Sequence, residues 1–215
     1  MSLFALKSTE KWKQYWQNRK IDWNKDYLQT WNHPHRYMIT GILKSIENEW
    51  KSLMEIGCGS GPNLVNIIKH FNNKQVGGVD VNKDAIKLAS ESFRGGHFKV
   101  GSGEDIMMSD DSCDVVLTDM MLIYVSPSKI DKYVKEIKRI GRKYIVLCEF
   151  HSYSFWSRMK LRMSSGYNAY DYRKLLEKYK FYDIELYKIP EEAWPGGNPQ
   201  KDYGYIIKAK IPKRK

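Results

Sequence analysis

Cysteine is scarce in this chain of 215 residues. Its three cysteines, Cys58, Cys113 and Cys148, lie far apart, form no C-x-x-C pair and have no histidine directly beside them. Structural zinc sites and disulfide frameworks depend on closely spaced ligands of this kind. The sequence therefore favours neither of these two features.

Long hydrophobic runs are missing as well. No apolar stretch approaches the roughly 20 residues that a membrane-spanning helix needs, and the apolar stretch within residues 1–7 is too short for a secretory signal. We therefore expect a cytoplasmic protein without a membrane span. With 42% hydrophobic residues, the chain can bury the core of one domain that carries an N-terminal extension.

Acidic residues are the minority among the charged ones. The chain has 25 Asp and Glu against 36 Lys and Arg, which gives a net charge of +11. The basic residues are spread along the whole length, and the only dense run is 213–215. Two interpretations stay open: a lysine-rich solvated surface, or an anionic partner such as RNA, toward which a basic protein is steered.

Two phosphate-binding motifs are absent, although a glycine-rich turn is present. Residues 53–61 read LMEIGCGSG, with Gly57, Gly59 and Gly61 at alternate positions. The dinucleotide fingerprint G-x-G-x-x-G needs its third glycine where Pro62 stands, and the phosphate loop G-x-x-x-x-G-K-[ST] does not occur. A strand followed by such a turn and a helix still builds a crevice of nucleotide size at the carboxyl edge of a sheet.

The pattern E-x-G-x-G-x-G resembles motif I of the class I S-adenosylmethionine (SAM)-dependent methyltransferases. This resemblance implies SAM as the cofactor. It also implies that the turn formed by Gly57, Cys58, Gly59 and Gly61 packs against the amino-acid part of SAM. Glu55, two residues before the first glycine, then orients the turn or receives the SAM ammonium group.

Strand-like and helix-like runs alternate after residue 52, which predicts a parallel sheet with helices on both faces. The resemblance implies the methyltransferase form of this α/β fold, a doubly wound, mostly parallel, Rossmann-like sheet of seven strands that ends in an antiparallel hairpin. The expected strands are 52–57, 76–81, 98–100, 115–118, 144–148, 183–189 and 204–211. Helices are expected from Pro62, after Asn82, at 129–140 and at 171–179.

The first 50 residues have a different character. Aromatic side chains crowd a short polar stretch in which two helices are expected, at 9–19 and 35–49. We therefore divide the chain into a helical extension, 1–50, and a SAM-binding domain, 51–215. The extension is either a structural cap or a lid, since aromatic faces attract sulfonium cations and lids exclude water.

The resemblance assigns further residues to the cofactor. Asp80 ends the second strand, where an acidic side chain accepts hydrogen bonds from both ribose hydroxyls, and Val81 lies beneath the adenine. Segment 101–106 resembles the family's G-D-A-E-D-L stretch, although Ser102 stands where the family often has Asp. The candidates for the adenine edge are the Gly103 backbone and the side chain of Glu104 or Asp105.

Four other residues are candidates for the amino-acid end of SAM. Asp119 and Met120 end the fourth strand and are expected beside the sulfonium. Arg36 is the candidate for the SAM carboxylate, because a guanidinium pairs with a carboxylate through two parallel hydrogen bonds. Arg19 competes with Arg36 for that role.

Motifs of base-modifying methyltransferases are absent after the fourth strand. Residues 119–125 contain neither [DNS]-P-P-[YFW], usual for adenine N6 or planar amides, nor the Pro-Cys nucleophile used on cytosine C5. They are closer to the x-x-x-L-x-H-V pattern of small-molecule and sugar methyltransferases, with Tyr124 where His is common. The resemblance therefore favours a small-molecule acceptor.

Methyl transfer to an oxygen or a weakly acidic nitrogen needs a general base and alignment in a dry site. The candidates for the base are Tyr124, Glu149 at the end of the fifth strand, and His151 just after it. Asp119 and Glu149 would be part of a Mg²⁺ site in catechol-type relatives, but the rest of that acidic set is missing. We therefore predict no metal.

The leading hypothesis is a SAM-dependent methyltransferase that acts on an oxygen or nitrogen of a small molecule, such as a sugar or a ring-bearing metabolite. Residues 153–172 and 194–198 flank the carboxyl edge and are expected to form the acceptor pocket. Two alternatives stay open: an RNA-modifying methyltransferase and a non-catalytic SAM-binding partner subunit. We expect a monomer or a homodimer.

Overall fold

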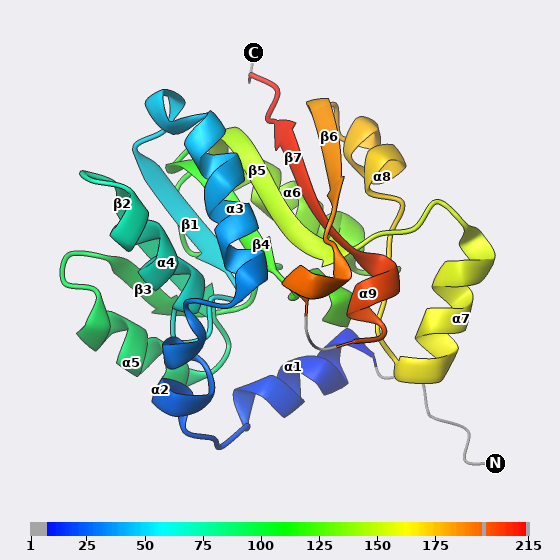
Figure 1. Ribbon diagram of the computed structural model, residues 1–215, viewed down its shortest axis with the longest axis horizontal. Helices are drawn as coiled ribbons and strands as arrows, with labels where there is room; N and C mark the ends of the chain where they lie inside the picture. Colours follow the sequence, from blue (N-terminus) through cyan, green and yellow to red (C-terminus); the bar gives the residue numbers. More distant parts are fainter. Residues whose placement is uncertain (1–7, 195–196, 214–215) are drawn as a thin grey trace.

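A seven-stranded sheet runs through the computed structural model, which describes residues 8–194 and 197–213 (Figure 1). The strand order is β3-β2-β1-β4-β5-β7-β6, and β7 is antiparallel to both of its neighbours. The other neighbouring strands are parallel, which confirms the predicted doubly wound sheet with its terminal hairpin. The strands are β1 (Ser52–Ile56), β2 (Gln75–Asp80), β3 (His97–Val100), β4 (Cys113–Asp119), β5 (Gly141–Phe150), β6 (Tyr182–Lys188) and β7 (Gly204–Lys210).

Helices cover both faces of the sheet because successive strand residues point to opposite sides. Leu53 packs in one core cluster with α3 (Pro34–Ser45), α4 (Pro62–His70) and α5 (Lys83–Ser92). Its neighbour Met54 packs in another, with α6 (Ile130–Ile140) and α8 (Tyr172–Lys178). Both clusters are buried, so the central strands are apolar on both faces, as expected of a parallel sheet.

Several elements differ from the sequence-based expectation. The expected helix at 35–49 ends at Ser45 and is followed by the 3₁₀ turn η2 (Glu47–Glu49), and β5 begins at Gly141, three residues early. The sequence reading missed six short or surface elements. They are α2 (Trp23–Asp26), η1 (Leu28–Thr30), η3 (Leu122–Tyr124), α7 (Phe155–Ser165), η4 (Glu191–Ala193) and α9 (Gln200–Tyr203).

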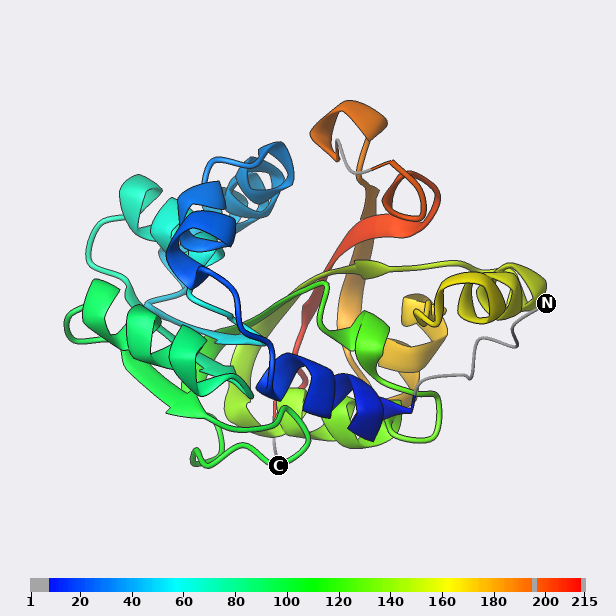
Figure 2. The same ribbon diagram turned by 90° about the horizontal axis from the view of Figure 1, so that it is seen from below.

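The N-terminal helix α1 (Thr9–Gln17) crosses the carboxyl edge of the sheet (Figure 2). At one end, the Thr9 hydroxyl accepts a hydrogen bond from the Ser126 amide, 2.8 Å away, and donates to the Ser126 hydroxyl, 2.9 Å away. At the other end, the Asn82 side-chain amide donates to the carbonyls of Trp16 and Arg19, at 2.9 and 3.0 Å. The helix is therefore fastened on both sides of the edge that it crosses.

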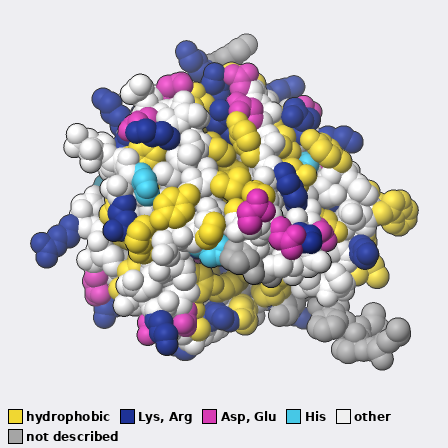
Figure 3. Space-filling view, viewed as in Figure 1, with side chains coloured by type: hydrophobic (Ala, Val, Ile, Leu, Met, Phe, Trp, Pro, Cys, Tyr) yellow, Lys and Arg dark blue, Asp and Glu magenta, His cyan; other side chains and the backbone are white. Residues whose placement is uncertain are grey.

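Charged side chains of both signs are interspersed on the face shown in Figure 3. Several of them form exposed ion pairs, such as Lys178 with Asp131 at 2.7 Å. In the part of the chain that the structure describes, no helix has the length and apolar character to cross a membrane. The predicted features at residues 1–7, 195–196 and 214–215 lie outside the described residues.

Asn82 is expected to stabilise both α5 and the attachment of α1. Its side-chain oxygen accepts from the amides of Asp84 and Ala85, both at 3.0 Å, which caps α5. Asn82→Ala removes these bonds together with those to α1, so the free energy of unfolding should fall by about 1–3 kcal/mol. Urea denaturation measures this loss.

Asn82→Asp is the matched variant, because its carboxylate still caps α5 but cannot donate to the carbonyls of α1. It should lose less stability than Asn82→Ala. The exposed Asn72 serves as the control site, where alanine should change little. Equal stability of Asn82→Ala and the unmodified protein would contradict this role.

Candidate functional site

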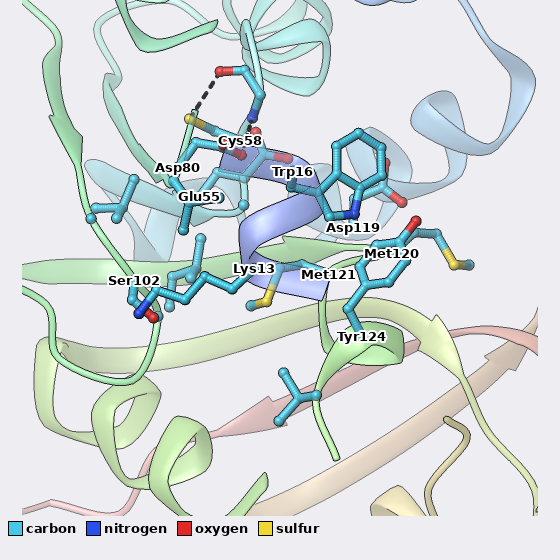
Figure 4. A pocket seen from close by; sticks show the side chains of 18 of the residues that line it. Lys13, Trp16, Glu55, Cys58, Asp80, Ser102, Asp119, Met120, Met121 and Tyr124 are labelled. Atoms are coloured by element: carbon cyan, nitrogen blue, oxygen red, sulfur yellow. Dashed lines mark hydrogen bonds between the residues drawn. The ribbon is translucent and has the colours of Figure 1, made fainter. Parts of the chain in front are cut away.

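A cavity lies where β1, β2 and β4 end, under α1 and α2 (Figure 4). Its sheet side includes Glu55, Asp80 and Asp119, and its opposite side includes aromatic residues of the extension. The cavity-lining residues of the extension are Thr9, Trp12, Lys13, Trp16, Trp23, Tyr27 and Arg36. The extension therefore covers a crevice at the carboxyl edge, where open α/β sheets bind their ligands.

The glycine-rich turn bends sharply beneath this cavity. Gly57 has a φ of 77° and Gly59 a φ of 53°, in the left-handed region that favours glycine. A Cβ atom on Gly57 would lie 2.5 Å from Cγ of Met121, so a larger residue does not fit there. The amides of Gly57 and Cys58 donate to the carbonyl of Val79, which fixes the turn to the end of β2.

Asp80 is held at the cavity by two backbone amides. Its Oδ2 accepts from Gly59 N at 2.9 Å, and its Oδ1 accepts from Asn82 N at 2.8 Å. Burial raises the pKa of Asp80, while the two amides act in the opposite direction. A carboxylate has about four acceptor positions, so Asp80 retains capacity for two further donors from a ligand.

Asn63, in the first turn of α4, connects two buried carboxylates. Its side-chain nitrogen donates to Glu55 Oε1 at 2.6 Å and to Asp119 Oδ2 at 3.0 Å. Arg36 donates through one guanidinium nitrogen to Asn63 Oδ1, at 2.7 Å, and to Asp119 Oδ2, at 2.8 Å. His35 Nε2 lies 3.0 Å from the same Asp119 oxygen.

The two carboxyl groups of this cluster have opposite pKa shifts. Burial raises the pKa of Glu55 to about 8, because its hydrogen bond with Asn63 offsets only part of the lost hydration. Burial also acts to raise the pKa of Asp119, but the charges of His35 and Arg36 and the hydrogen bonds hold it below its ordinary value. Asp119 is therefore ionised near pH 7, whereas Glu55 retains its proton.

Four buried polar atoms of cavity-lining residues have no hydrogen-bond partner among the described residues. Two are carboxyl oxygens, Glu55 Oε2 and Asp119 Oδ1, and two are donors, Trp16 Nε1 and Trp23 Nε1. Burying such groups without partners is costly. They fit a ligand that brings both a donor and an acceptor, as the ammonium and carboxylate of an amino acid do.

Met120, which lines the cavity, has an unusual backbone conformation. Its φ of 52° lies in the left-handed region, which a residue with a long side chain rarely adopts. Such backbone strain persists only where the surrounding structure imposes it, and it clusters at ligand sites. The Met120 amide donates to the carbonyl of Cys148, 2.8 Å away, which fixes this conformation.

Residues 53–143 match a family model described as a methyltransferase domain. This match agrees with the resemblance that the glycine-rich turn carries. The cavity fits the predicted cofactor, SAM, because it offers the unpartnered Glu55 Oε2 and Trp23 Nε1 beside an acidic residue, Asp80, at the end of β2.

The chain is similar to the ribosomal protein L11 methyltransferase of Dictyoglomus turgidum, with 26% identity over 120 residues. The match covers 54% of this chain and 39% of that protein, so it spans well under half of the relative.

Two solved structures share the fold of this chain. Geranyl diphosphate C-methyltransferase from Streptomyces coelicolor A3(2) superposes with a TM-score of 0.69 and 13% identity, over 95% of this chain and 98% of the other. Magnesium protoporphyrin IX methyltransferase from Synechocystis PCC 6803, solved with bound SAM, superposes with a TM-score of 0.64 and 13% identity. This match covers 97% of this chain and 99% of the other. At such low identity these likenesses describe the fold alone.

Most of the residues predicted to bind SAM line the cavity of the methyltransferase domain. The structure brings together Arg36, Glu55, Gly57, Cys58, Gly59, Asp80, Val81, Gly103, Asp119 and Met120. Gly61, Glu104 and Asp105 are not among the cavity-lining residues. Gly61 is the N-cap of α4, and Glu104 pairs with Lys13, Lys129 and Lys132 at 3.4, 3.3 and 3.7 Å.

The three candidates for the general base lie in different environments. Tyr124 lines the cavity, with its ring centroid 4.8 Å from that of Trp12, and burial raises the pKa of its phenol above its ordinary value. Glu149 is fully buried, and its oxygens accept three backbone amides of residues 121–123. Glu149 therefore holds η3 in place and does not line the cavity.

His151 lies at a separate depression, together with Lys160 and Tyr205. Its Nδ1 accepts from the Tyr172 amide at 3.2 Å, and burial lowers the pKa of the ring to about 4. His151 is therefore neutral near pH 7. Of the three candidates, the structure brings only Tyr124 to the cavity of the methyltransferase domain.

Asn63 is the functional residue that sequence reasoning missed. The available signal was an asparagine at the second position of a helix whose other early residues are apolar. His35 was not predicted either, although it contacts Asp119 and packs its ring against that of Trp194, with ring centroids 4.4 Å apart. Both residues contact the buried carboxyl groups and not the glycine-rich turn. A search for the motif of that turn therefore does not reveal them.

Ligand atoms of His35, Asp119 and Cys148 lie within 4.8 Å of one another, the spacing of a small metal site. Arg36 already places a fixed positive charge 2.8 Å from Asp119 Oδ2. A cation at this position would be repelled by the guanidinium. The geometry therefore suits a hydrogen-bond cluster better than a metal.

Glu55 is expected to make the stability of the methyltransferase domain pH-dependent. Its pKa rises from 4.5 in the unfolded chain to about 8 in the folded state, so between these values the folded state binds more protons. The free energy of unfolding therefore falls as pH rises, by at most about 1.4 kcal/mol per pH unit. Glu55→Gln accepts the Asn63 bond but cannot ionise, so it should lose the share of the slope that Glu55 contributes. Glu149, whose pKa burial also raises to about 8, should keep its own share.

Urea denaturation of both proteins between about pH 5 and 8 measures this difference. Glu177→Gln, a change at an exposed carboxylate, is the control and should keep the slope of the unmodified protein. If Glu55→Gln and the unmodified protein had parallel pH profiles, Glu55 would not be the titrating group.

Proposed function

We propose that this chain transfers the methyl group of SAM to an oxygen or nitrogen of a small molecule. The observation that carries the proposal is the lined cavity at the carboxyl edge, where Asp80 and the buried Glu55 flank the glycine-rich turn beneath an aromatic cover. Bound SAM supplies an electrophilic methyl group on a sulfonium centre. The chain's own residues then hold, orient and dehydrate the reacting groups.

Different residues hold different parts of the cofactor in this proposal. Asp80 accepts hydrogen bonds from the ribose hydroxyls with the capacity that its two backbone amides leave free. Glu55 Oε2 and Trp23 Nε1 face the amino-acid part. Arg36, although engaged with Asp119, also lines the cavity and adds positive charge near the SAM carboxylate.

The N-terminal extension acts as a lid in this proposal. Trp12, Trp16 and Tyr124 form a group of rings, with centroids 4.8 and 5.5 Å apart across the Tyr124 contacts. Electron-rich ring faces stabilise a sulfonium cation. The same rings exclude water from the site of transfer.

A small acceptor is favoured because α1 is fastened across the edge at Thr9 and at Asn82. A macromolecule could not bring its reacting atom to the cavity while α1 is in this position. The names of the similar proteins point to different acceptors: a ribosomal protein, geranyl diphosphate and magnesium protoporphyrin IX. They support methyl transfer without choosing an acceptor.

Tyr124 is proposed to orient the acceptor through its hydroxyl. Its raised pKa keeps the phenol protonated near pH 7, so it donates a hydrogen bond rather than removing a proton. This role suits an acceptor whose nucleophile is already deprotonated or is a neutral amine. Asp119 also lines the cavity and is ionised near pH 7. It is the other side chain that can accept a proton or a hydrogen bond from the acceptor molecule.

Asp80→Asn is expected to weaken SAM binding about 10- to 100-fold, the value of hydrogen bonds to a charged group. The variant keeps the size of the side chain and one oxygen acceptor. Isothermal titration calorimetry with SAM measures the dissociation constant. Asp131→Asn, at an exposed site on α6 that pairs with Lys178, is the control and should bind SAM normally. Equal affinity of all three proteins would remove the ribose assignment.

Methyl transfer itself is tested with SAM that carries a labelled methyl group. The purified chain is incubated with the metabolite, RNA and protein fractions of a cell extract, and label should accumulate in the metabolite fraction. Label in RNA would instead support the RNA-modifying alternative, and no transfer would support a non-catalytic SAM-binding subunit.

Tyr124→Phe should lower kcat about two- to tenfold, the worth of one neutral hydrogen bond, with SAM affinity unchanged. Tyr37→Phe, at an exposed position on the outside of α3, is the matched control. An unchanged kcat for Tyr124→Phe would exclude its hydroxyl from the reaction.

A further inference from the structure

Helix α7 (Phe155–Ser165) leaves the body of the protein at the carboxyl edge, directly after β5 (Figure 1). Only one of its residues, Leu161, is buried. Surface helices of globular proteins normally turn their apolar stripe toward the core. Helix α7 does not follow this pattern.

The apolar side chains of α7 point outward. At 100° per residue, Phe155, Met159, Met163 and Trp156 fall within one arc of about 100°, on the side away from Leu161. Trp156 is 78% exposed, Met163 65% and Phe155 57%. Figure 3 shows hydrophobic side chains projecting at the edge of the molecule that α7 occupies.

Basic residues flank this outward arc. Helix α7 contains Arg158, Lys160 and Arg162 and no acidic residue. On the helical wheel, Lys160 lies on one side of the arc and Arg162 on the other. Lys160 is exposed and Arg162 half-buried, and among the described residues neither forms an ion pair, so no carboxylate neutralises their charge.

We propose that α7 docks on the surface of an anionic phospholipid bilayer. A helix with a Trp and Phe face between basic residues is the arrangement that lies in a membrane interface. The apolar side chains would enter the headgroup region, and the flanking cations would meet lipid phosphates. The chain's net charge of +11 adds long-range attraction to such a surface.

The charge of α7 disfavours other occupants of the same face. A second copy of the chain, related by a two-fold axis, would place Lys160 and Arg162 against their own counterparts. Single-stranded nucleic acid needs neighbouring flat rings on which successive bases stack, whereas Met159 and Met163 separate the rings of Phe155 and Trp156 on this arc. Flexible methionines with flanking cations suit acyl chains below a layer of phosphates.

Docking through α7 would bring the cavity next to the bilayer. Trp12 of α1 donates from Nε1 to the carbonyl of Gly166, which ends α7, at 3.4 Å. The next residue, Tyr167, places its ring 5.7 Å from Trp12 and 5.7 Å from Tyr124, which lines the cavity. The inference goes beyond the proposed function and does not depend on it, because docking needs no catalysis.

Co-sedimentation of the full chain with vesicles tests this inference. We expect binding to vesicles of phosphatidylcholine and phosphatidylglycerol (3:1), weaker binding at high salt, and little binding to phosphatidylcholine alone. The double variant Phe155→Ser/Trp156→Ser should bind the anionic vesicles at least about tenfold more weakly. Each serine removes the favourable free energy of moving an aromatic ring out of water into the bilayer. Lys160→Gln should cost about fivefold.

Met107→Ser is the matched control, because Met107 is 80% exposed but lies in the loop after β3. It should bind vesicles like the unmodified protein, and thermal melts should show that all variants are folded. Binding that the double variant retains in full would assign it to general surface charge and overturn the proposal.

Two further results would also overturn it. One is an absence of vesicle binding together with RNA binding that the double variant loses. The other is a dimer in solution that the same variant dissociates.

Discussion

Two buried carboxylates share one asparagine, and the geometry of the cavity depends on that arrangement. Glu55 belongs to β1 and Asp119 to β4, while Asn63 comes from α4 and Arg36 from α3. A buried charge is tolerated only when it is paired and hydrogen-bonded. The cluster therefore ties two strands and two helices together at the point where a ligand would rest. Two carboxyl oxygens of the cluster, Glu55 Oε2 and Asp119 Oδ1, have no partner among the described residues.

Helix α1 covers this cluster, and its attachment to the sheet differs from the contacts within the cluster. Helix α1 adds no strand to the sheet and is held by a few hydrogen bonds and ring contacts, including Thr9 with Ser126 and Asn82 with the carbonyl of Trp16. Contacts of this kind open at lower cost than strand pairing. The sheet and the cluster can therefore remain intact while the cover moves. This separation permits a site that is dry when closed and still accessible.

Much of the fold was predictable because the signals were local. The alternation of apolar runs identified the seven strands, and Gly57 and Gly59 marked the turn at the end of β1. The placement of Asp80 followed from its position at the end of β2. These features depend on neighbouring residues, and family motifs describe them well.

The remaining parts of the site depend on contacts between distant segments. Asn63 matters only because β4 brings Asp119 beside it, 56 residues along the chain. Glu149 was a candidate base at the end of a strand, but the fold turns the amides of residues 121–123 toward it. Helix α7 was missed because its apolar residues point outward, so its pattern does not describe a packed helix. Whether its face meets water or another surface cannot be read from spacing alone.

Asp80 and Asn82 stand two residues apart, yet one faces the cavity and the other fastens α1. The Asn82 amide also donates to Asp80 Oδ1, so the two are parts of one short turn. A molecule that binds Asp80 therefore also restrains Asn82 and its contact with α1. By reciprocity, a closed α1 strengthens the binding of that molecule. In the proposed function, this coupling would act on the spent cofactor as it does on the fresh one. The same short turn that favours loading of the site would therefore oppose its emptying.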